Sequence, residues 1–170
     1  MELTLKNKYF GTDGFRGEAN VNLTSVQAYK VGRFLGWYFG TALAGNNKPC
    51  YRPKIVIGKD TRRSSYMLEY SIVAGITASG ADAYMLHVTT TPSVSYVTSR
   101  DDFDCGIMIT ASHNPFYDNG IKIINRHGEK LDDATTALIE AYIDGELDLL
   151  GVEGEDLPLA SGDKVGAIID

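Results

Sequence analysis

Short apolar runs alternate with longer segments of helical periodicity along this sequence, and the alternation limits the fold more than any other feature. The apolar runs cover residues 54–58, 81–88, 105–110 and 120–124. The helical segments cover 24–43, 64–79, 132–144 and a short stretch that opens at Thr91-Pro92. Strands that alternate with helices of this length build layered α/β domains with helices on both faces of the sheet. We therefore expect a three-layer α/β/α fold with a mixed, mostly parallel sheet of about four strands.

Polar side chains at the expected helix starts indicate where the helices begin. Thr24 can cap the helix over 24–43, and Asp132 can cap the helix that follows the last strand. The second long helix has two candidate caps, Ser64 and Ser65. A cap accepts backbone N–H groups that have no partner inside the helix, so these residues predict the entry points of the helices.

The composition is that of a globular domain with an acidic balance. The chain has 170 residues, with 22 acidic and 16 basic side chains and a formal net charge of −6. This length is enough to bury one core, so we expect one folding unit. A negatively charged chain has no long-range positive field to hold nucleic acid or an anionic membrane. We therefore expect neither as a partner.

The cysteines and the start of the sequence indicate a reducing compartment. Cys50 and Cys105 lack C-x-x-C spacing and are too few for a disulfide framework. Cys105 begins an apolar run, where a buried free thiol is typical. Residues 1–11 have no apolar signal core, and the uncharged stretch 34–47 is shorter than the roughly 20 residues of a membrane span. We expect a cytoplasmic protein.

The end of the sequence differs in character from what precedes it. Six acidic residues lie in the thirteen positions 144–156, which is typical of a solvated loop. An apolar segment follows at 164–170. We expect the folding unit to cover residues 1–160, with residues 161–170 as a linker or the start of a second domain.

The most informative segment is Thr110-Ala111-Ser112-His113-Asn114-Pro115, which begins where an apolar strand ends. Ligands of α/β sheets bind at the carboxyl ends of strands. Pro115 removes one backbone donor and stiffens the segment. The Asn119-Gly120 pair that follows predicts a turn with positive φ. The chain can therefore leave the sheet, form a polar loop and rejoin the sheet.

Lys122 interrupts the apolar strand into which this loop returns. Side chains alternate across a strand, so Ile121 and Ile123 face one way and Lys122 the other. The returning chain can bring Lys122 near Ser112, where an ammonium would polarise an oxygen or hold a phosphate. By spacing alone, a turn serine, an exposed His113 and an edge lysine explain the pattern as well. Both interpretations stay open on the residues alone.

A serine hydrolase site is disfavoured. α/β hydrolases place the nucleophile in a Gly-x-Ser-x-Gly elbow, and the sequence around Ser112 has neither glycine. His113 would need an unusual loop to turn onto the serine beside it. His87 and His127 have no evident acidic partner in the sequence.

Two segments with glycine and arginine precede the serine. Tyr9-Phe10-Gly11-Thr12-Asp13-Gly14-Phe15-Arg16-Gly17 predicts a loop that approaches a ligand closely, with Arg16 suited to a phosphate. It matches neither the Walker nor the Rossmann pattern, so nucleotide binding is not supported. Gly58-Lys59-Asp60-Thr61-Arg62 follows a strand and precedes a helix. It can form an anion site from helix-end N–H groups or a simple βα turn, and the turn is favoured.

Taken together and in this order, the three segments resemble the phosphohexomutase superfamily. The resemblance runs from Tyr9 to about Leu131, and the stretch 112–122 is similar to the phosphoserine loop of that family. Lys59 stands where the family has arginine. The likeness is to the first of four domains, in the branch that interconverts glucosamine 6-phosphate and glucosamine 1-phosphate.

The resemblance implies a role for each site residue. Ser112 would carry a phosphoryl group, give it to a hexose monophosphate and recover the other phosphate from a bisphosphate intermediate. Lys122 matches the lysine assigned general acid and base work, Arg16 the arginine that helps hold the phosphoserine, and His113 would contribute to the transfer site. Phosphoryl transfer depends on positioning and charge stabilisation, and cations would offset a phosphoserine charge of about −1.5 to −2.

The resemblance also implies parts that lie outside these residues. Mg²⁺ would bind a phosphate oxygen on Ser112, with its other ligands in an Asp-x-Asp-x-Asp loop that the 170 residues do not contain. In the family, that loop lies in the second domain, and the sugar-selecting loops lie in the third and fourth. The fragment would then be inactive alone. Two alternatives stay open, the first domain of a phosphoglucomutase or phosphomannomutase, and a non-catalytic phosphosugar-binding domain.

Overall fold

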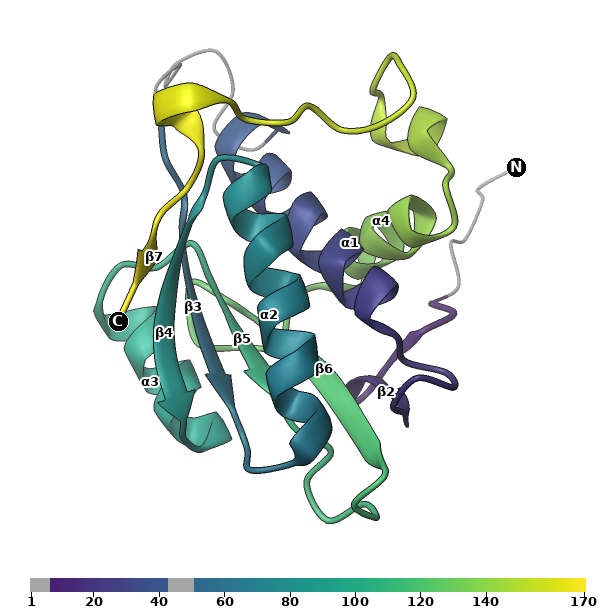
Figure 1. Cartoon of the computed structure of the whole chain (residues 1–170), viewed down its shortest axis with the longest axis vertical. Coiled ribbons are helices and arrows are strands. Elements are labelled where there is room, and N and C mark those ends of the chain that lie inside the picture. The colour runs from purple at the N-terminus through teal and green to yellow at the C-terminus, as the bar shows by residue number, and fades with distance from the viewer. Residues whose placement is uncertain (1–6, 43–50) are drawn as a thin grey trace.

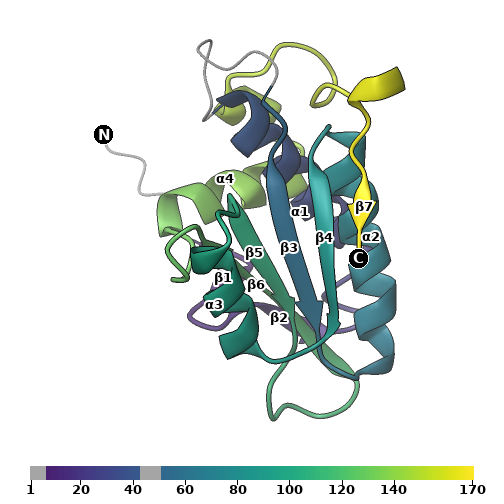
Figure 2. The same cartoon turned by 90° about the vertical axis from the view of Figure 1, so that its left-hand side faces the viewer.

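A computed structural model describes residues 7–42 and 51–170 and has the expected α/β/α layers. The α-helices of these residues are α1 (Ser25–Trp37), α2 (Arg63–Ala78), α3 (Thr91–Arg100) and α4 (Asp133–Ile143). Figure 2 shows α2 on one face of the sheet and α3 on the other. α1 packs along α2, and α4 packs against α1 (Figure 1). The helix end predicted near Leu43 and the predicted free thiol of Cys50 lie outside the described residues.

Within the described residues, one sheet has seven strands in the order β1-β2-β6-β5-β3-β4-β7. They are β1 (Phe10–Gly11), β2 (Gly14–Glu18), β3 (Lys54–Lys59), β4 (Asp82–Val88), β5 (Cys105–Ile109), β6 (Asp118–Asn125) and β7 (Ile168–Ile169). β3 pairs in parallel with β4 and β5, and β7 pairs in parallel with β4. The other three pairs, β1-β2, β2-β6 and β5-β6, are antiparallel.

The four predicted strands are confirmed, but the expected number of strands and the mostly parallel pairing are wrong. The three additional strands, β1, β2 and β7, are short, and two of them lie in the glycine-rich segment that was predicted to be a loop. Strands this short carry no hydrophobic periodicity of their own, because the sheet beside them supplies their partners. The sheet is therefore evenly divided between parallel and antiparallel pairs.

The main core lies between the sheet and the layer of α1, α2 and α4. Ile121 and Ile123 of β6 belong to this core, while Ile124 packs with Met108 and Val94 on the α3 face. The predicted alternation along β6 is therefore confirmed. Burying each such side chain contributes about 1.5–3 kcal/mol. Cys105 is fully buried, and this burial raises the pKa of its thiol well above the usual range.

The helix starts follow the capping prediction at two of three places. Thr24 and Gln27 form a capping box at α1, and the carboxylate of Asp132 accepts the N–H of Thr135 at α4. At α2 the predicted serine cap is wrong, because Arg62 is the N-cap residue and no side chain caps the helix. Ser65 is instead buried and donates its hydroxyl to Asp60. This bond belongs to the candidate site.

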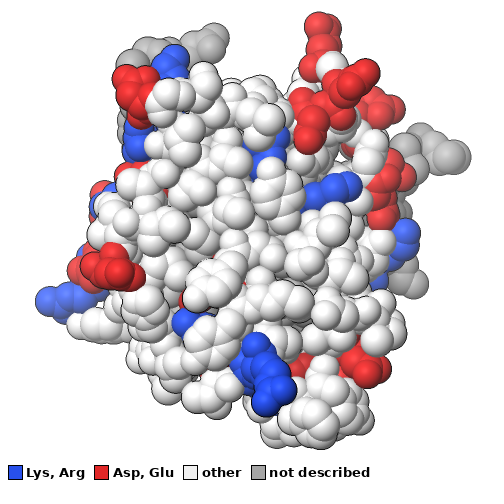
Figure 3. Space-filling view, in the orientation of Figure 1, with Lys and Arg blue, Asp and Glu red and all other residues white. Residues whose placement is uncertain are grey.

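The C-terminal part of the chain returns along the helical layer to the sheet. Acidic side chains of residues 144–156 gather at the upper right of Figure 3, where most are exposed, as predicted. β7 then adds an edge strand beside β4. The domain boundary expected after residue 160 stays a prediction. Among the described residues, no helix is long and apolar enough to cross a bilayer.

Candidate active site

The carboxyl ends of β3 and β5 meet at the lower edge of the sheet in Figure 1. The loop of residues 110–117, called the serine loop below, leaves the sheet from there. Ser112 lies in this loop and is exposed. Its backbone adopts the left-handed region with φ 54°. This conformation costs a residue with a Cβ roughly 1–2 kcal/mol, so contacts from the surroundings must hold it.

Thr110 and Asp60 hold the N–H side of Ser112. The hydroxyl of Thr110 accepts the backbone N–H of Ser112 at 3.0 Å and donates to Oδ2 of Asp60 at 2.7 Å. Oδ1 of Asp60 accepts the hydroxyl of Ser65 at 2.7 Å and the N–H of Arg62 at 3.0 Å. Burial alone would raise the pKa of Asp60, but the hydrogen bonds from Ser65, Thr110 and Arg62 outweigh it and lower that pKa.

Arg62 holds the carbonyl side of the same loop. Its Nη2 donates to the carbonyl of Ser112 at 2.8 Å, and its Nε donates to Oδ2 of Asp60 at 3.0 Å. The segment 58–62 is thus the predicted βα turn, but its charged side chains support the serine loop, which the sequence did not indicate. The side chain of Lys59 is directed toward helix α2 instead, where its buried ammonium pairs with Glu69 at 3.0 Å.

Arg16 lies on β2, in a hairpin that replaces the predicted loop. Its register partner on β6 is Gly120. A Cβ on Gly120 would lie 2.6 Å from the carbonyl oxygen of Thr110 and 2.9 Å from Cγ of Arg16. The predicted turn at Asn119-Gly120 is therefore wrong: both residues belong to β6, and the glycine is needed because the arginine crosses over it. Nη1 of Arg16 lies 4.0 Å from Asp13, and its buried Nε has no hydrogen-bond partner among the described residues.

Lys122 lies on β6, and its side chain is on the same face of the sheet as that of Arg16. It is the register partner of Met108, and a Cβ on Gly14 would lie 3.1 Å from its Cγ. Lys122 is two positions along β6 from Gly120, the partner of Arg16, so the two cations are diagonal neighbours roughly 7–8 Å apart at their backbones. Lys122 forms no ion pair within the part of the chain that the structure describes. It lines a cavity of about 210 Å³ with Thr12, Asp13, Ser95 and Lys130 among its walls.

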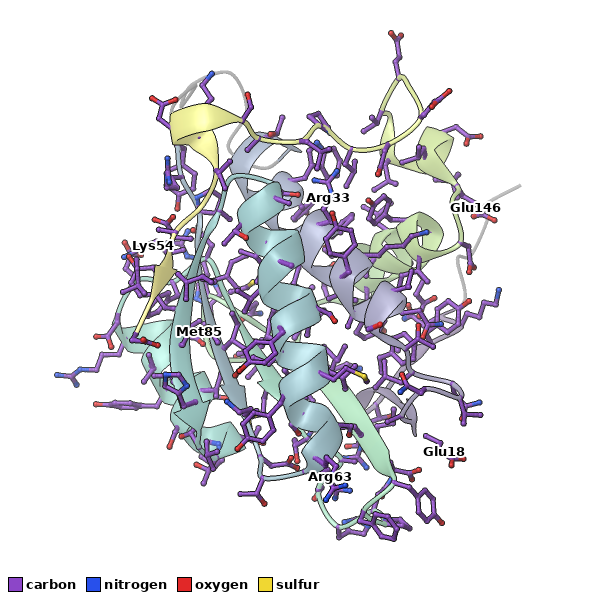
Figure 4. All side chains as sticks on the ribbon, in the orientation of Figure 1. Glu18, Arg33, Lys54, Arg63, Met85 and Glu146 are labelled. Carbon is purple, nitrogen blue, oxygen red and sulfur yellow. The ribbon has the colours of Figure 1, made fainter. Side chains whose placement is uncertain are left out.

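The structure brings Arg16 of β2 and Lys122 of β6 together on one face of the sheet, and places Ser112 and His113 in the loop beyond the end of β5. A separate hollow of about 630 Å³ contains Ser112, with Asp60, Arg62 and Arg63 in its wall. Figure 4 shows Arg63 at the start of α2, next to this loop. No hydrogen bond joins Ser112 to Arg16 or Lys122 within the described residues. His113 is exposed and makes no side-chain hydrogen bond there.

Two further residues position the site in ways that the local sequence does not indicate. Glu140 of α4 accepts the backbone N–H groups of Lys8, Tyr9 and Phe10 at 2.6–2.8 Å and so fixes the strand that leads to Arg16. Asn119 donates to the hydroxyls of Ser64 and Ser65 and is fully buried. For Asp60 and Arg62 a signal does exist, because two oppositely charged residues stand two positions apart directly after strand β3.

The side chains around Ser112 offer few free ligands for the expected Mg²⁺. No group of three or more His, Cys, Asp or Glu side chains that could hold a metal occurs in residues 7–42 and 51–170. Both oxygens of Asp60 are already hydrogen-bonded. An exposed phosphate on Ser112 could offer oxygen to an ion, and magnesium prefers such ligands. Among the described residues around this loop, a phosphate on Ser112 is therefore the group that would hold the ion.

Comparisons with known proteins place the chain in a family. A sequence profile described as Phosphoglucomutase/phosphomannomutase, alpha/beta/alpha domain I, matches residues 7–149. A protein of Lachnospira eligens named phosphoglucosamine mutase is 65% identical over 96% of this chain and 34% of its own length. A protein of the same name from Bacillus cereus is 45% identical over 96% of the chain and 33% of its own length. The chain thus spans about a third of the curated relatives that it matches.

Solved structures give the same fold. A putative phosphomannomutase from Thermus thermophilus aligns with a TM-score of 0.69 over 95% of this chain and 32% of its own, at 22% identity. A phosphoglucomutase/phosphomannomutase family protein from Burkholderia thailandensis aligns with a TM-score of 0.68 over 94% of this chain and 32% of its own, at 22% identity. Because the domain I profile matches residues 7–149, the chain belongs to the phosphoglucomutase/phosphomannomutase family and forms its α/β/α domain I.

Proposed function

We propose that the chain is the phosphoserine-bearing first domain of a phosphosugar mutase that interconverts glucosamine 6-phosphate and glucosamine 1-phosphate. The observation that carries the proposal is Ser112, exposed at the carboxyl edge of the sheet and held in a left-handed conformation at both its N–H and its carbonyl. Strained residues that are fixed by their surroundings cluster at reactive sites. The glucosamine specificity is supported by the names of relatives 45–65% identical to this chain.

In the proposed reaction the hydroxyl oxygen of Ser112 accepts and donates one phosphoryl group. Phosphoserine 112 transfers its phosphoryl group to the free hydroxyl of the hexose monophosphate, which gives a bisphosphate and free serine. The bisphosphate then returns its other phosphoryl group to the serine oxygen, so atoms and charge balance over one turnover. The barrier to such a transfer is lowered mainly by alignment of the reacting groups and by stabilisation of the phosphoryl charge.

Arg16 and Lys122 are the cations that this domain offers to the transferring phosphoryl group. They share one face of the sheet, on the neighbouring strands β2 and β6, and the buried Nε of Arg16 lacks a hydrogen-bond partner within the described residues. Lys122 has a flexible stem and can act as a general acid and base at the sugar hydroxyl. His113, beside the nucleophile, contributes to the transfer site.

Magnesium is part of the proposal through the phosphate on Ser112. When bound, the ion would neutralise charge on that phosphate, and its remaining ligands would come from outside these residues. The domain assignment of residues 1–160, the fragment's inactivity alone and the cytoplasmic location belong to the same proposal. Hexose phosphate and the remaining domains of the enzyme are the proposed partners.

The test uses protein from the complete reading frame and compares Ser112→Ala with Ser99→Ala, an exposed serine of α3. Intact mass and peptide mapping should find phosphate on Ser112 in the wild type, and mutase turnover should be lost only in Ser112→Ala. Lys122→Ala should lower turnover while the thermal midpoint stays nearly unchanged. Full activity in Ser112→Ala would overturn the proposed mechanism.

The substrate class is tested separately. Rates with glucosamine 6-phosphate, glucose 6-phosphate and mannose 6-phosphate are compared at equal concentrations. The highest kcat/KM is expected for glucosamine 6-phosphate. A higher value for glucose or mannose phosphate would assign the chain to the alternative phosphoglucomutase or phosphomannomutase activity. Binding of all three without turnover would indicate a non-catalytic phosphosugar-binding protein.

A further inference from the structure

The guanidinium of Arg62 uses all of its N–H donors on two partners, the serine loop and Asp60. Nη1 donates to the carbonyls of Pro115 at 2.5 Å and Asp118 at 3.1 Å. Nη2 donates to the carbonyls of Ser112 at 2.8 Å and Asn114 at 2.9 Å. Nε donates to Asp60 at 3.0 Å. Arginine has five such donors, so none is left for a phosphate.

These contacts link parts of the chain that are far apart in sequence. The four carbonyl groups lie 50–56 residues beyond Arg62; three belong to the exposed loop 110–117, and the fourth belongs to Asp118 at the start of β6. A backbone carbonyl in such a loop normally binds water, whereas here a single planar cation orders four of them. Hydrogen bonds from a charged donor are stronger than those from a neutral one. The side chain of Arg62 is 12% exposed, which limits competition from solvent.

Asp60 fixes the guanidinium itself and extends the support to the other side of Ser112. Its Oδ2 accepts both Nε of Arg62 and the hydroxyl of Thr110, and that hydroxyl accepts the N–H of Ser112. The peptide groups on both sides of the serine Cα are therefore held from one carboxylate–guanidinium pair. This arrangement selects the left-handed φ of 54° at Ser112.

We propose that Arg62 is a positioning residue for phosphoryl transfer: it holds the serine loop and touches neither phosphate nor sugar. The inference rests on the proposed function, because positioning matters only if Ser112 reacts. A misplacement of about 1 Å in a reacting group can lower turnover about 100-fold. Substitution of Arg62 should therefore lower kcat about 100-fold and leave KM for the hexose phosphate within about twofold.

Two substitutions in the complete enzyme separate positioning from charge. Arg62→Lys keeps the positive charge, but one ammonium has three donors and cannot reach four carbonyls and a carboxylate. Arg62→Ala leaves a space that free ethylguanidinium can fill. We expect both variants to lose turnover, and millimolar ethylguanidinium to restore part of it in Arg62→Ala but none in Arg62→Lys. Arg126→Ala, which removes an exposed arginine paired with Asp102, is the matched control.

A second readout does not depend on catalysis. Amide hydrogen exchange over residues 111–118 should rise at least tenfold in both Arg62 variants and stay unchanged in Arg126→Ala, with the far-UV circular dichroism of all variants alike. Unchanged exchange and unchanged kcat in Arg62→Lys would overturn the positioning role, as would a rise in KM without a fall in kcat. If exchange rises but the wild-type protein has no mutase turnover, the loop support holds and the proposed function fails.

Discussion

The carboxylate of Glu140 accepts the backbone N–H of Phe10 at 2.7 Å and so ties helix α4 to the first strand of the sheet across 130 residues of sequence. The same carboxylate accepts the N–H groups of Lys8 and Tyr9. Glu140 is only 5% exposed, so its charge is compensated by these three donors rather than by water. Because β1 forms a hairpin with β2, this bond also sets where Arg16 lies.

Substitution of Glu140 by glutamine should destabilise the chain and loosen the strand that carries Arg16. One of the two carboxylate oxygens becomes an NH₂ group that faces a backbone N–H, and the loss of charge weakens the remaining bonds. We expect a fall in the free energy of unfolding of about 1–3 kcal/mol. Urea denaturation measures it, with the exposed Glu146→Gln as control (Figure 4). Equal stability of the two variants would contradict the anchoring role.

Gly120→Ala should displace Arg16 and weaken the pairing of β5 with β6. The added Cβ would lie 2.6 Å from the carbonyl oxygen of Thr110, and backbone at this distance must move. Forced contacts of this kind cost about 1–3 kcal/mol. The control is Gly11→Ala, whose added Cβ has its nearest neighbour at 4.0 Å. Thermal denaturation of both variants measures the effect, and the midpoint of Gly120→Ala should be the lower one. A similar midpoint for the two would show that the space over Gly120 is not restrictive.

The layered fold could be predicted because the long strands and helices carry their own patterns. The apolar runs that became β3 and β5 are buried almost throughout, those that became β4 and β6 keep several buried apolar residues, and Thr24 and Asp132 cap helices through local bonds. β1, β2 and β7 could not be predicted, since two to five residues show no period and their partners come from distant strands. Glycine at position 120 likewise reflects a neighbour, Arg16, rather than a turn.

The reactive residues of the candidate site can be predicted from the sequence, but the residues that hold them in place cannot. Ser112 lies in a polar loop directly after an apolar strand, and Lys122 is a charged residue within an apolar strand. Both patterns are local, so both residues can be identified from the sequence. The bonds from Arg62 and Glu140 connect positions 50 or more residues apart, and no local pattern reports them. Their proximity follows only from the strand order of the sheet.

Arg33 should be essential for holding the C-terminal segment against α1. Arg33 is labelled in Figure 4, and its side chain is fully buried. Its guanidinium donates to the carbonyl of Leu157 at 2.6 Å, the carbonyl of Pro158 at 3.1 Å and the hydroxyl of Ser79. Arg33→Met keeps most of the volume but leaves these acceptors without partners. We expect a loss of about 2–4 kcal/mol in stability.

Limited proteolysis locates this effect. In Arg33→Met, cleavage should begin within residues 151–161 under conditions in which the wild type is intact, because that segment loses its attachment before the core unfolds. The exposed control Arg126→Met should behave as the wild type does. Cleavage that begins instead within the sheet would show that Arg33 supports the core and not the segment.

The order of the serine loop should depend on the protonation of Asp60. Hydrogen bonds hold the pKa of Asp60 below its usual value, so the folded state binds this proton less readily than the unfolded chain. The resulting stabilisation is complete above an unfolded pKa of about 3.9 and is lost as the pH falls through the lower folded pKa.

Amide exchange over residues 111–118, corrected for intrinsic rates, should be constant from pH 7 to about 5 and rise below about 4. In Asp60→Asn the loop should exchange faster at pH 7 and lose this pH dependence, whereas the exposed Asp148→Asn should keep it. A wild-type loop that remains protected after Asp60 has become protonated, as its carboxyl NMR signal reports, would contradict the role of the carboxylate, because protonation removes the charge that holds Arg62 and Thr110 in place.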